Sequence, residues 1–376
     1  MNNMKSMNIE SLSELALKEA LTAKLQKLGG GVDWLQGWKL EPSQPTRGFD
    51  IQAKVSLPNG TTSALYVECK RDVRPSSFLA LADKPFFKTG LPRGGVPVLG
   101  APWISPRVAD LCTERGWSWF DLAGNYRLDI PGLLHLQNTG NKPVFKRPSP
   151  TANLSTPEAA RVMRALLAPE QVGVRWTQRE IQRCCQPSVS LGLVNKMARY
   201  LRDEAFVEAT QADGFRLRDP QKLLEAWRDA YRFDQNRRKS YFTLLQGNQL
   251  RNALAQFGAR SDVRAAYAAF SAAEIQAPHV RQPKTWIYVR EQDVDLFAQQ
   301  IEAKPVDSGE NVVLLVPPDD GVFYLPYERS TSNGLACTNP VQTYVDLFYC
   351  GGRGQEAAEA LLEQRLKPEW KKQGIP

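Results

Sequence analysis

The spacing of hydrophobic residues in the first third of the chain predicts a mixture of helices and strands. Leucines recur at helical spacing between residues 17 and 28, which predicts a helix over residues 9–28 that ends at three glycines. Residues 85–106 form a stretch rich in proline and glycine. Runs of alternating or β-branched residues predict strands over 49–57, 63–70, 117–122 and 126–130. A short helix is predicted separately, over 106–115.

A second periodic region follows a linker rich in proline, serine, threonine and lysine at residues 142–157. Helices are predicted over 157–167, 178–185 and 189–204, and two short strands over 206–210 and 215–218. Thr177 and Glu180 have the spacing of a capping box before the second helix, and Ser188 is placed to cap the third. This order of elements is typical of a winged helix-turn-helix.

The third predicted helix of this region combines an apolar face with a polar, basic one. In a winged helix, the third helix enters the major groove and the hairpin contacts phosphates, so we assign DNA binding to this face and to the wing. A module for protein contacts is the alternative interpretation. The residues assigned to DNA are Thr177, Gln178, Arg179, Ser188, Ser190, Asn195, Lys196, Arg199, Arg202, Arg216 and Arg218.

The last third of the chain alternates predicted helices and strands. Helices are expected up to about residue 270, strands over 285–289, 311–316 and 321–325, and a final helix over 355–366. The basic run at 237–239 follows a helix and is interpreted either as a phosphate contact or as a solvated helix end. The resulting domain division is 1–145, 155–235 and 236–376.

Charge changes this picture because it is not evenly distributed. The 376 residues carry a formal net charge of +8. Residues 1–154 hold 19 basic and 13 acidic side chains, residues 155–260 hold 18 and 11, and residues 261–376 hold 11 and 16. The first two segments are therefore suited to a polyanion and the last is not.

The composition also narrows the function classes. Two histidines make a histidine-based hydrolase or a histidine-rich zinc site improbable on composition alone, and six cysteines without paired spacing indicate reduced thiols. No apolar run is long enough to span a membrane, and the N-terminal residues do not resemble a secretory signal. A cytoplasmic protein without membrane contact is expected.

Two carboxylates and a lysine in the first segment form a candidate nuclease centre. Asp50 begins one predicted strand, and Glu68 and Lys70 lie on one face near the end of the next. A hairpin around Asn59 brings Asp50 beside Glu68, although the sequence leaves open whether both share a face. Asp50 and Glu68 could bind Mg²⁺ and Lys70 could orient a water, as in the PD-(D/E)xK nuclease core; a structural salt bridge is the alternative.

The assembled pattern resembles the AbiEi-type antitoxins of type IV toxin–antitoxin systems. More narrowly, it is similar to the long members with a restriction-endonuclease-like domain before the winged helix. The resemblance covers roughly residues 45–366. It is carried by LYVECK at 65–70, APWISP at 101–106 with FDLAGN at 120–125, SLGLVNK at 190–196, and PVQTYVDL at 340–347 with GGRGQEAA at 351–358.

This resemblance implies an α+β, multidomain protein: a restriction-endonuclease-like α/β domain, a winged helix-turn-helix and a C-terminal α/β domain. It implies a double-stranded DNA-binding autorepressor, encoded beside a toxin that it counters without a stable complex. Such a regulator requires no cofactor for DNA binding, and paired half-sites favour a homodimer. The alternative is a Mg²⁺-dependent DNA endonuclease that uses Asp50, Glu68 and Lys70. We favour the regulator over the endonuclease, and whether the protein has enzymatic activity is left open.

Overall fold

The computed structural model of the protein forms two compact units. The first comprises Met1–Ser149 with Asp203–Ala205, and the second comprises Pro150–Arg202 with Phe206–Pro376. The structure describes residues 13–42, 48–144, 151–210, 214–327 and 335–374. The division into three domains, 1–145, 155–235 and 236–376, stays a prediction.

The first unit is built on a seven-stranded sheet whose strand order follows the sequence. The three central strands are parallel to one another, and the outer pairs are antiparallel. The strands are β1 (Gly37–Pro42), β2 (Ile51–Ser56), β3 (Thr62–Cys69), β4 (Gly95–Ala101), β5 (Ser118–Asp121), β6 (Tyr126–Ile130) and β7 (Leu134–Asn138).

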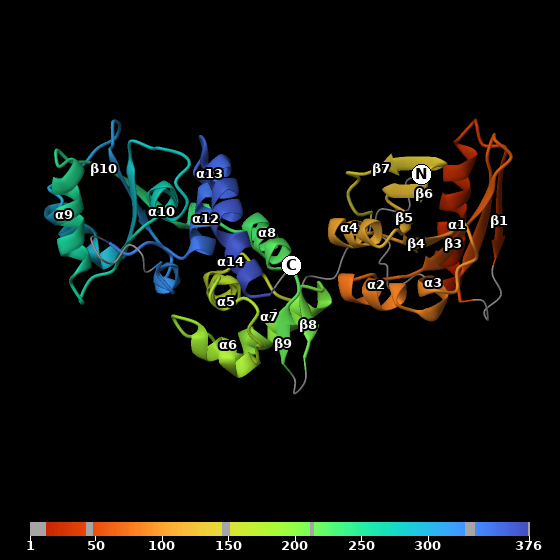
Figure 1. The fold of residues 1–376 in the computed structure, drawn as a ribbon, viewed down its shortest axis with the longest axis horizontal. Coiled ribbons are helices and arrows are strands. Elements are labelled where there is room, and N and C mark those ends of the chain that lie inside the picture. Colours follow the sequence, from red (N-terminus) through yellow and green to blue (C-terminus); the bar gives the residue numbers. More distant parts are fainter. Residues whose placement is uncertain (1–12, 43–47, 145–150, 211–213, 328–334, 375–376) are drawn as a thin grey trace. The chain divides into compact units, whose positions relative to one another are not determined.

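Helices cover both faces of this sheet (Figure 1). On one face, α1 (Glu14–Gly30) buries Leu17, Leu21 and Leu25 against strands β2–β6. On the other face, aromatic and aliphatic side chains form a second core under α2 (Pro75–Ala82), α3 (Pro85–Lys88) and α4 (Pro106–Glu114). Because the central strands are buried on both faces, they are nearly continuously apolar, as parallel sheets require.

Several predicted elements of this unit need correction. The helix expected over 9–28 begins at Glu14 among the described residues, and residues 9–12 lie outside them. The stretch rich in proline and glycine at 85–106 holds two elements for which the sequence gives no prediction, α3 and the central strand β4. Strands β1 and β7 and helix α2 were not predicted. Gly95 and Pro97 of β4 are residue types that favour loops. The buried, parallel pairing of β4 with β3 and β5 overrides this local preference.

The second unit begins with three helices and a hairpin, which are α5 (Pro157–Leu167), α6 (Gln178–Cys184), α7 (Leu191–Asp203), β8 (Val207–Ala209) and β9 (Phe215–Leu217). Trp176, just before α6, forms an isolated antiparallel β-bridge with Phe215 of the hairpin. The predicted turn at 211–214 lies outside the described residues except for Gly214. Helix α8 (Pro220–Ala230) follows.

A five-stranded sheet follows in the same unit, in the order β11-β12-β14-β10-β13. Helices α9 and α11 cover one face, and α10, α12 and α13 cover the other (Figure 1). The elements are β10 (Arg237–Phe242), α9 (Gly247–Gly258), β11 (Ala265–Tyr267), α10 (Ala269–Gln276), β12 (Thr285–Val289), α11 (Val294–Gln300), β13 (Lys304–Pro305), β14 (Val312–Val316), α12 (Pro340–Tyr349), α13 (Gly354–Leu361) and α14 (Lys367–Lys372).

Strand β14 shows how the sheet is buried. Val312, Leu314 and Val316 enter the core under α9 and α11, whereas Val313 and Leu315 enter the core on the opposite face. This second core continues without a break through α5, α7 and α8. Among the described residues, no helix is both long and apolar enough to cross a membrane.

Two predictions in this unit are wrong. The basic run at 237–239 belongs to strand β10, so the interpretation as a solvated helix end is wrong. Its charges pair with Glu291 and Glu310, and a phosphate contact there stays a prediction. The strand expected over 321–325 is a short 3₁₀ turn, Asp320–Phe323, which Asp319 caps by accepting a hydrogen bond from the amide of Gly321.

Candidate nucleic-acid interface

The start of α6 is fixed by the predicted capping box. The Thr177 hydroxyl accepts from the amide of Glu180 at 3.3 Å, and the Glu180 carboxylate accepts from the amide of Thr177 at 2.6 Å. These hydrogen bonds lower the pKa of Glu180. The Thr177 side chain is therefore already engaged in structure, although the sequence assigned it to DNA.

The start of α7 differs from the prediction. Ser190, not Ser188, caps the helix: its hydroxyl accepts from the amide of Leu193 at 3.2 Å. The carbonyl of Ser188 instead accepts from the Arg161 guanidinium of α5 at 3.1 Å. Both serines are exposed, but each also has a structural partner that positions the loop before α7.

Helix α7 is strongly two-faced. Val194, Met197 and Leu201 are buried in the core, with Ala198 between them. The opposite face carries exposed side chains that the sequence assigned to DNA, which are Asn195, Lys196, Arg199 and Arg202. The heptad-like spacing of the apolar positions thus forces the basic positions outward.

The basic residues of this face are not neutralised. Within the described ranges, Lys196, Arg199 and Arg202 form no ion pair, and neither does exposed Arg179 on α6. Asn195 donates a hydrogen bond to Gln178 across the two helices at 3.3 Å. We call this set the α7 face; it comprises half-buried Gln178 and exposed Arg179 on α6, and exposed Asn195, Lys196, Arg199 and Arg202 on α7.

The hairpin adds two arginines of different character. Arg216 on β9 pairs with Glu208 on the opposing strand β8. Arg218 is exposed and has no ion-pair partner among the residues described. Arg218 is therefore better placed than Arg216 to contact a phosphate without first breaking an internal pair.

The candidate nuclease residues meet in the first unit. Ile51 pairs with Val67 in the β2–β3 register, which places Asp50 opposite Glu68. This register puts both carboxylates on one face, a point that the sequence left open. They line a cleft of about 840 Å³ together with Lys18, Thr22 and Lys84.

Both carboxylates in this cleft are engaged by the protein itself. Asp50 accepts from the amide of Cys69 at 2.7 Å and pairs with Lys18 at 2.8 Å, which raises the pKa of that lysine. Glu68 pairs with Lys70 at 2.7 Å and lies 3.6 Å from Lys84. In the described part of the chain, no cluster of three potential metal ligands is present. This donor set does not fit a resident Mg²⁺, because its two carboxylates already pair with lysines and no third ligand joins them among the described residues.

Sequence reasoning missed a buried polar cluster on α12. Asp346 is fully buried, and one carboxylate oxygen accepts from Tyr231 at 2.8 Å, Tyr288 at 3.0 Å and Gln342 at 2.8 Å. Burial raises the pKa of Asp346 to about 7. Arg164 of α5 joins the cluster by donating to Gln342 at 2.6 Å. In the sequence, this cluster is signalled by polar residues at helical positions that are otherwise apolar, namely Arg164 in α5 and Gln342 and Asp346 in α12.

Comparison with known proteins was informative for the C-terminal part. Residues 216–367 match the family described as transcriptional regulator, AbiEi antitoxin, type IV TA system. The match covers less than half of the chain: it includes β9, α8 and the five-stranded sheet, but not α5–α7. The C-terminal part is thus similar to transcriptional regulators of the antitoxin class.

No curated protein matches the chain. A solved structure entitled "Structure of EndoMS in apo form" aligns with 10% identity over 29% of this chain and 47% of that chain, with a TM-score of 0.18. The chain thus spans about half the length of that protein. An overlap this poor does not define a shared fold.

Proposed function

We propose that the protein is a sequence-specific, double-stranded DNA-binding transcriptional regulator of the antitoxin type. In this proposal, residues 155–218 form a winged helix, α7 reads the major groove, and the wing contacts phosphates. The observation that carries the proposal is the unpaired basic α7 face, which is held outward by a buried apolar face of the same helix. The family match of residues 216–367 supports the regulatory role independently.

Two features of the proposal concern partners. A homodimer would read paired half-sites about one helical turn apart and so lengthen the recognised sequence. A toxin encoded beside this gene would be countered without a stable complex. The acidic C-terminal segment, residues 261–376, suits contact with itself or with protein partners better than contact with DNA.

Binding to a duplex from the protein's own promoter tests this function. We expect a defined footprint, and we expect affinity to fall by roughly 10³-fold or more between about 50 and 200 mM salt, because several Lys and Arg side chains release counterions from phosphates. The measurement is fluorescence anisotropy across a salt series, with a scrambled duplex as control. Equal affinity for both duplexes would remove the sequence-specific part of the proposal.

The second candidate is a DNA nuclease centred on Asp50, Glu68 and Lys70. The register that places Asp50 opposite Glu68 in an open cleft favours it. The lysine pairs of both carboxylates favour instead a restriction-endonuclease-like scaffold that adds nonspecific affinity through Lys18, Lys70 and Lys84.

Incubation of supercoiled and linear DNA with Mg²⁺ or Mn²⁺ separates these candidates. We expect binding without cleavage, because the carboxylates are already neutralised. Wild-type protein is compared with Glu68→Ala at equal concentrations on an agarose gel. Cleavage by the wild type that disappears in the variant would establish the nuclease instead.

A further inference from the structure

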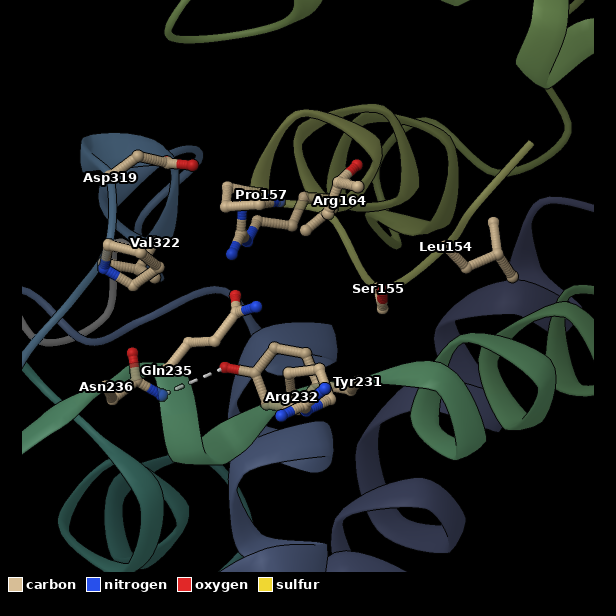
Figure 2. Close-up of a pocket in the computed structure, with 13 residues that line it drawn as sticks. Leu154, Ser155, Pro157, Arg164, Tyr231, Arg232, Gln235, Asn236, Asp319 and Val322 are labelled. Carbon is tan, nitrogen blue, oxygen red and sulfur yellow. Dashed lines mark hydrogen bonds between the residues drawn. The ribbon is translucent and has the colours of Figure 1, made fainter.

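A small pocket lies inside the second unit where three segments meet (Figure 2). These are residues 154–157 with the start of α5, residues 231–236 after α8, and residues 318–322 at the 3₁₀ turn. Its volume is about 20 Å³, which is enough for a water-sized group. Exposed Arg232, Gln235 and Pro318 are among its lining residues, so the pocket reaches the surface.

The inner wall of the pocket carries an unpaired cationic group. Arg164 is only 3% exposed, and its Nη1 has no hydrogen-bond partner among the described residues, while Nε donates to Gln342. Figure 2 shows the guanidinium of Arg164 and the amide of Gln235 directed into the same space. A buried guanidinium nitrogen without an acceptor is costly, so an acceptor oxygen at this position would be strongly favoured.

The other groups around the pocket define the kind of occupant. Asn236 is buried, and its Oδ1 is also unpaired among the described residues. Asp319 forms an ion pair with Arg161 at 3.4 Å, although its Oδ2 has no hydrogen-bond partner among the described residues, and Arg232 pairs with Asp234 at 2.7 Å. Arg164 therefore remains as the cation without a direct ion pair at the inner wall.

We propose that this pocket binds an anionic oxygen of a small carboxylate or phosphate compound, with Arg164 as its principal partner. Because the pocket holds only a water-sized group, the oxygen enters while the remainder of the ligand lies toward Arg232 and Gln235. The start of α5 lines the same space, and the positive end of its dipole adds to the attraction for an anion. This site is distinct from the α7 face and does not depend on DNA binding.

Thermal unfolding of the full chain tests the site. Sodium phosphate and sodium acetate are titrated at constant ionic strength, with sodium chloride as reference. We expect a saturable rise in Tm with at least one of the two anions, because a ligand that binds only the folded state stabilises it. Arg164→Gln should abolish the rise. Gln235→Glu should weaken the apparent affinity by about 10-fold or more, because it places a carboxylate at the mouth.

Gln249→Glu is the matched control, since Gln249 is an exposed residue of α9 and the charge change is identical. It should bind as the wild type does. If Arg164→Gln does not fold, Gln235→Glu still decides, because Gln235 is exposed and its substitution removes no buried contact. A rise with phosphate alone identifies a phosphate group, and one with acetate alone a carboxylate. Absence of a saturable rise with both anions, or one that Gln235→Glu leaves unchanged, overturns the site.

Discussion

Replacement of both Lys196 and Arg199 by alanine is expected to weaken binding to duplex DNA by about 10- to 100-fold. Both side chains project from α7 on the face opposite Val194, Met197 and Leu201, and neither has an ion pair among the described residues. Their loss should therefore remove the proposed contacts to DNA without disturbing an internal ion pair. The salt dependence should fall as well, by about one unit of slope for each lost phosphate contact.

Fluorescence anisotropy at fixed salt measures this effect. The matched control is Arg281→Ala combined with Lys304→Ala, which removes the same charge from two exposed positions away from the α7 face. The control should retain wild-type affinity. Equal loss in both double variants would show that only net charge matters, and no loss in the first would remove α7 from the DNA interface.

Asp346→Asn is expected to remove one component of the pH dependence of stability between about pH 4 and 7, in which the free energy of unfolding falls as the pH rises. Burial raises the pKa of Asp346 to about 7 in the folded protein, from an ordinary value of 3.8. The Asp346 carboxyl therefore makes its full contribution to the free energy of unfolding when it is protonated, and this contribution is lost as the pH rises through 7. The contribution of Asp346 to the stability of the wild-type protein should thus grow as the pH falls from 8 toward 5, relative to Asp346→Asn.

The variant should be more stable than the wild type at pH 8, by on the order of a few kcal/mol, because it avoids a buried carboxylate. Asn can keep the acceptor for Tyr231, Tyr288 and Gln342, and it places its amide where the second carboxylate oxygen has no partner among the described residues. The measurement is hydrogen exchange of peptides from α12 at a series of pH values, which reports the stability of the second unit. Exposed Asp307→Asn serves as control, and an unchanged pH slope in Asp346→Asn would contradict the prediction.

Local pattern was sufficient where one period dominates the sequence. Helix α5 and strands β6 and β12 have the predicted bounds, because their apolar positions follow a single spacing without interruption. Strand β10 was not predicted, because Arg237 and Arg238 are exposed and interrupt the apolar alternation that identifies a strand. Their charges are satisfied by Glu291 and Glu310, which are distant in sequence.

The candidate sites show the same limit. The outward basic positions of α7 follow from helical spacing, so they could be predicted residue by residue. The cleft required the β2–β3 register, and the pairing of Asp50 with Lys18 required the position of α1, neither of which the sequence fixes. The Arg164 pocket joins three segments separated by up to 168 positions, from Leu154 to Val322, so it could be found only in three dimensions.

Helix α5 makes hydrogen bonds to two parts of the second unit, less than one turn apart. Arg161 binds the carbonyl of Ser188 in the loop before α7, and Arg164 binds Gln342 of α12. Helix α5 therefore contributes to the positions of both α7 and α12. Under the proposed function, genetic changes that alter operator choice need not lie on the α7 face: suppressors of defects at α7 should arise in α12, within the region that matches the antitoxin family.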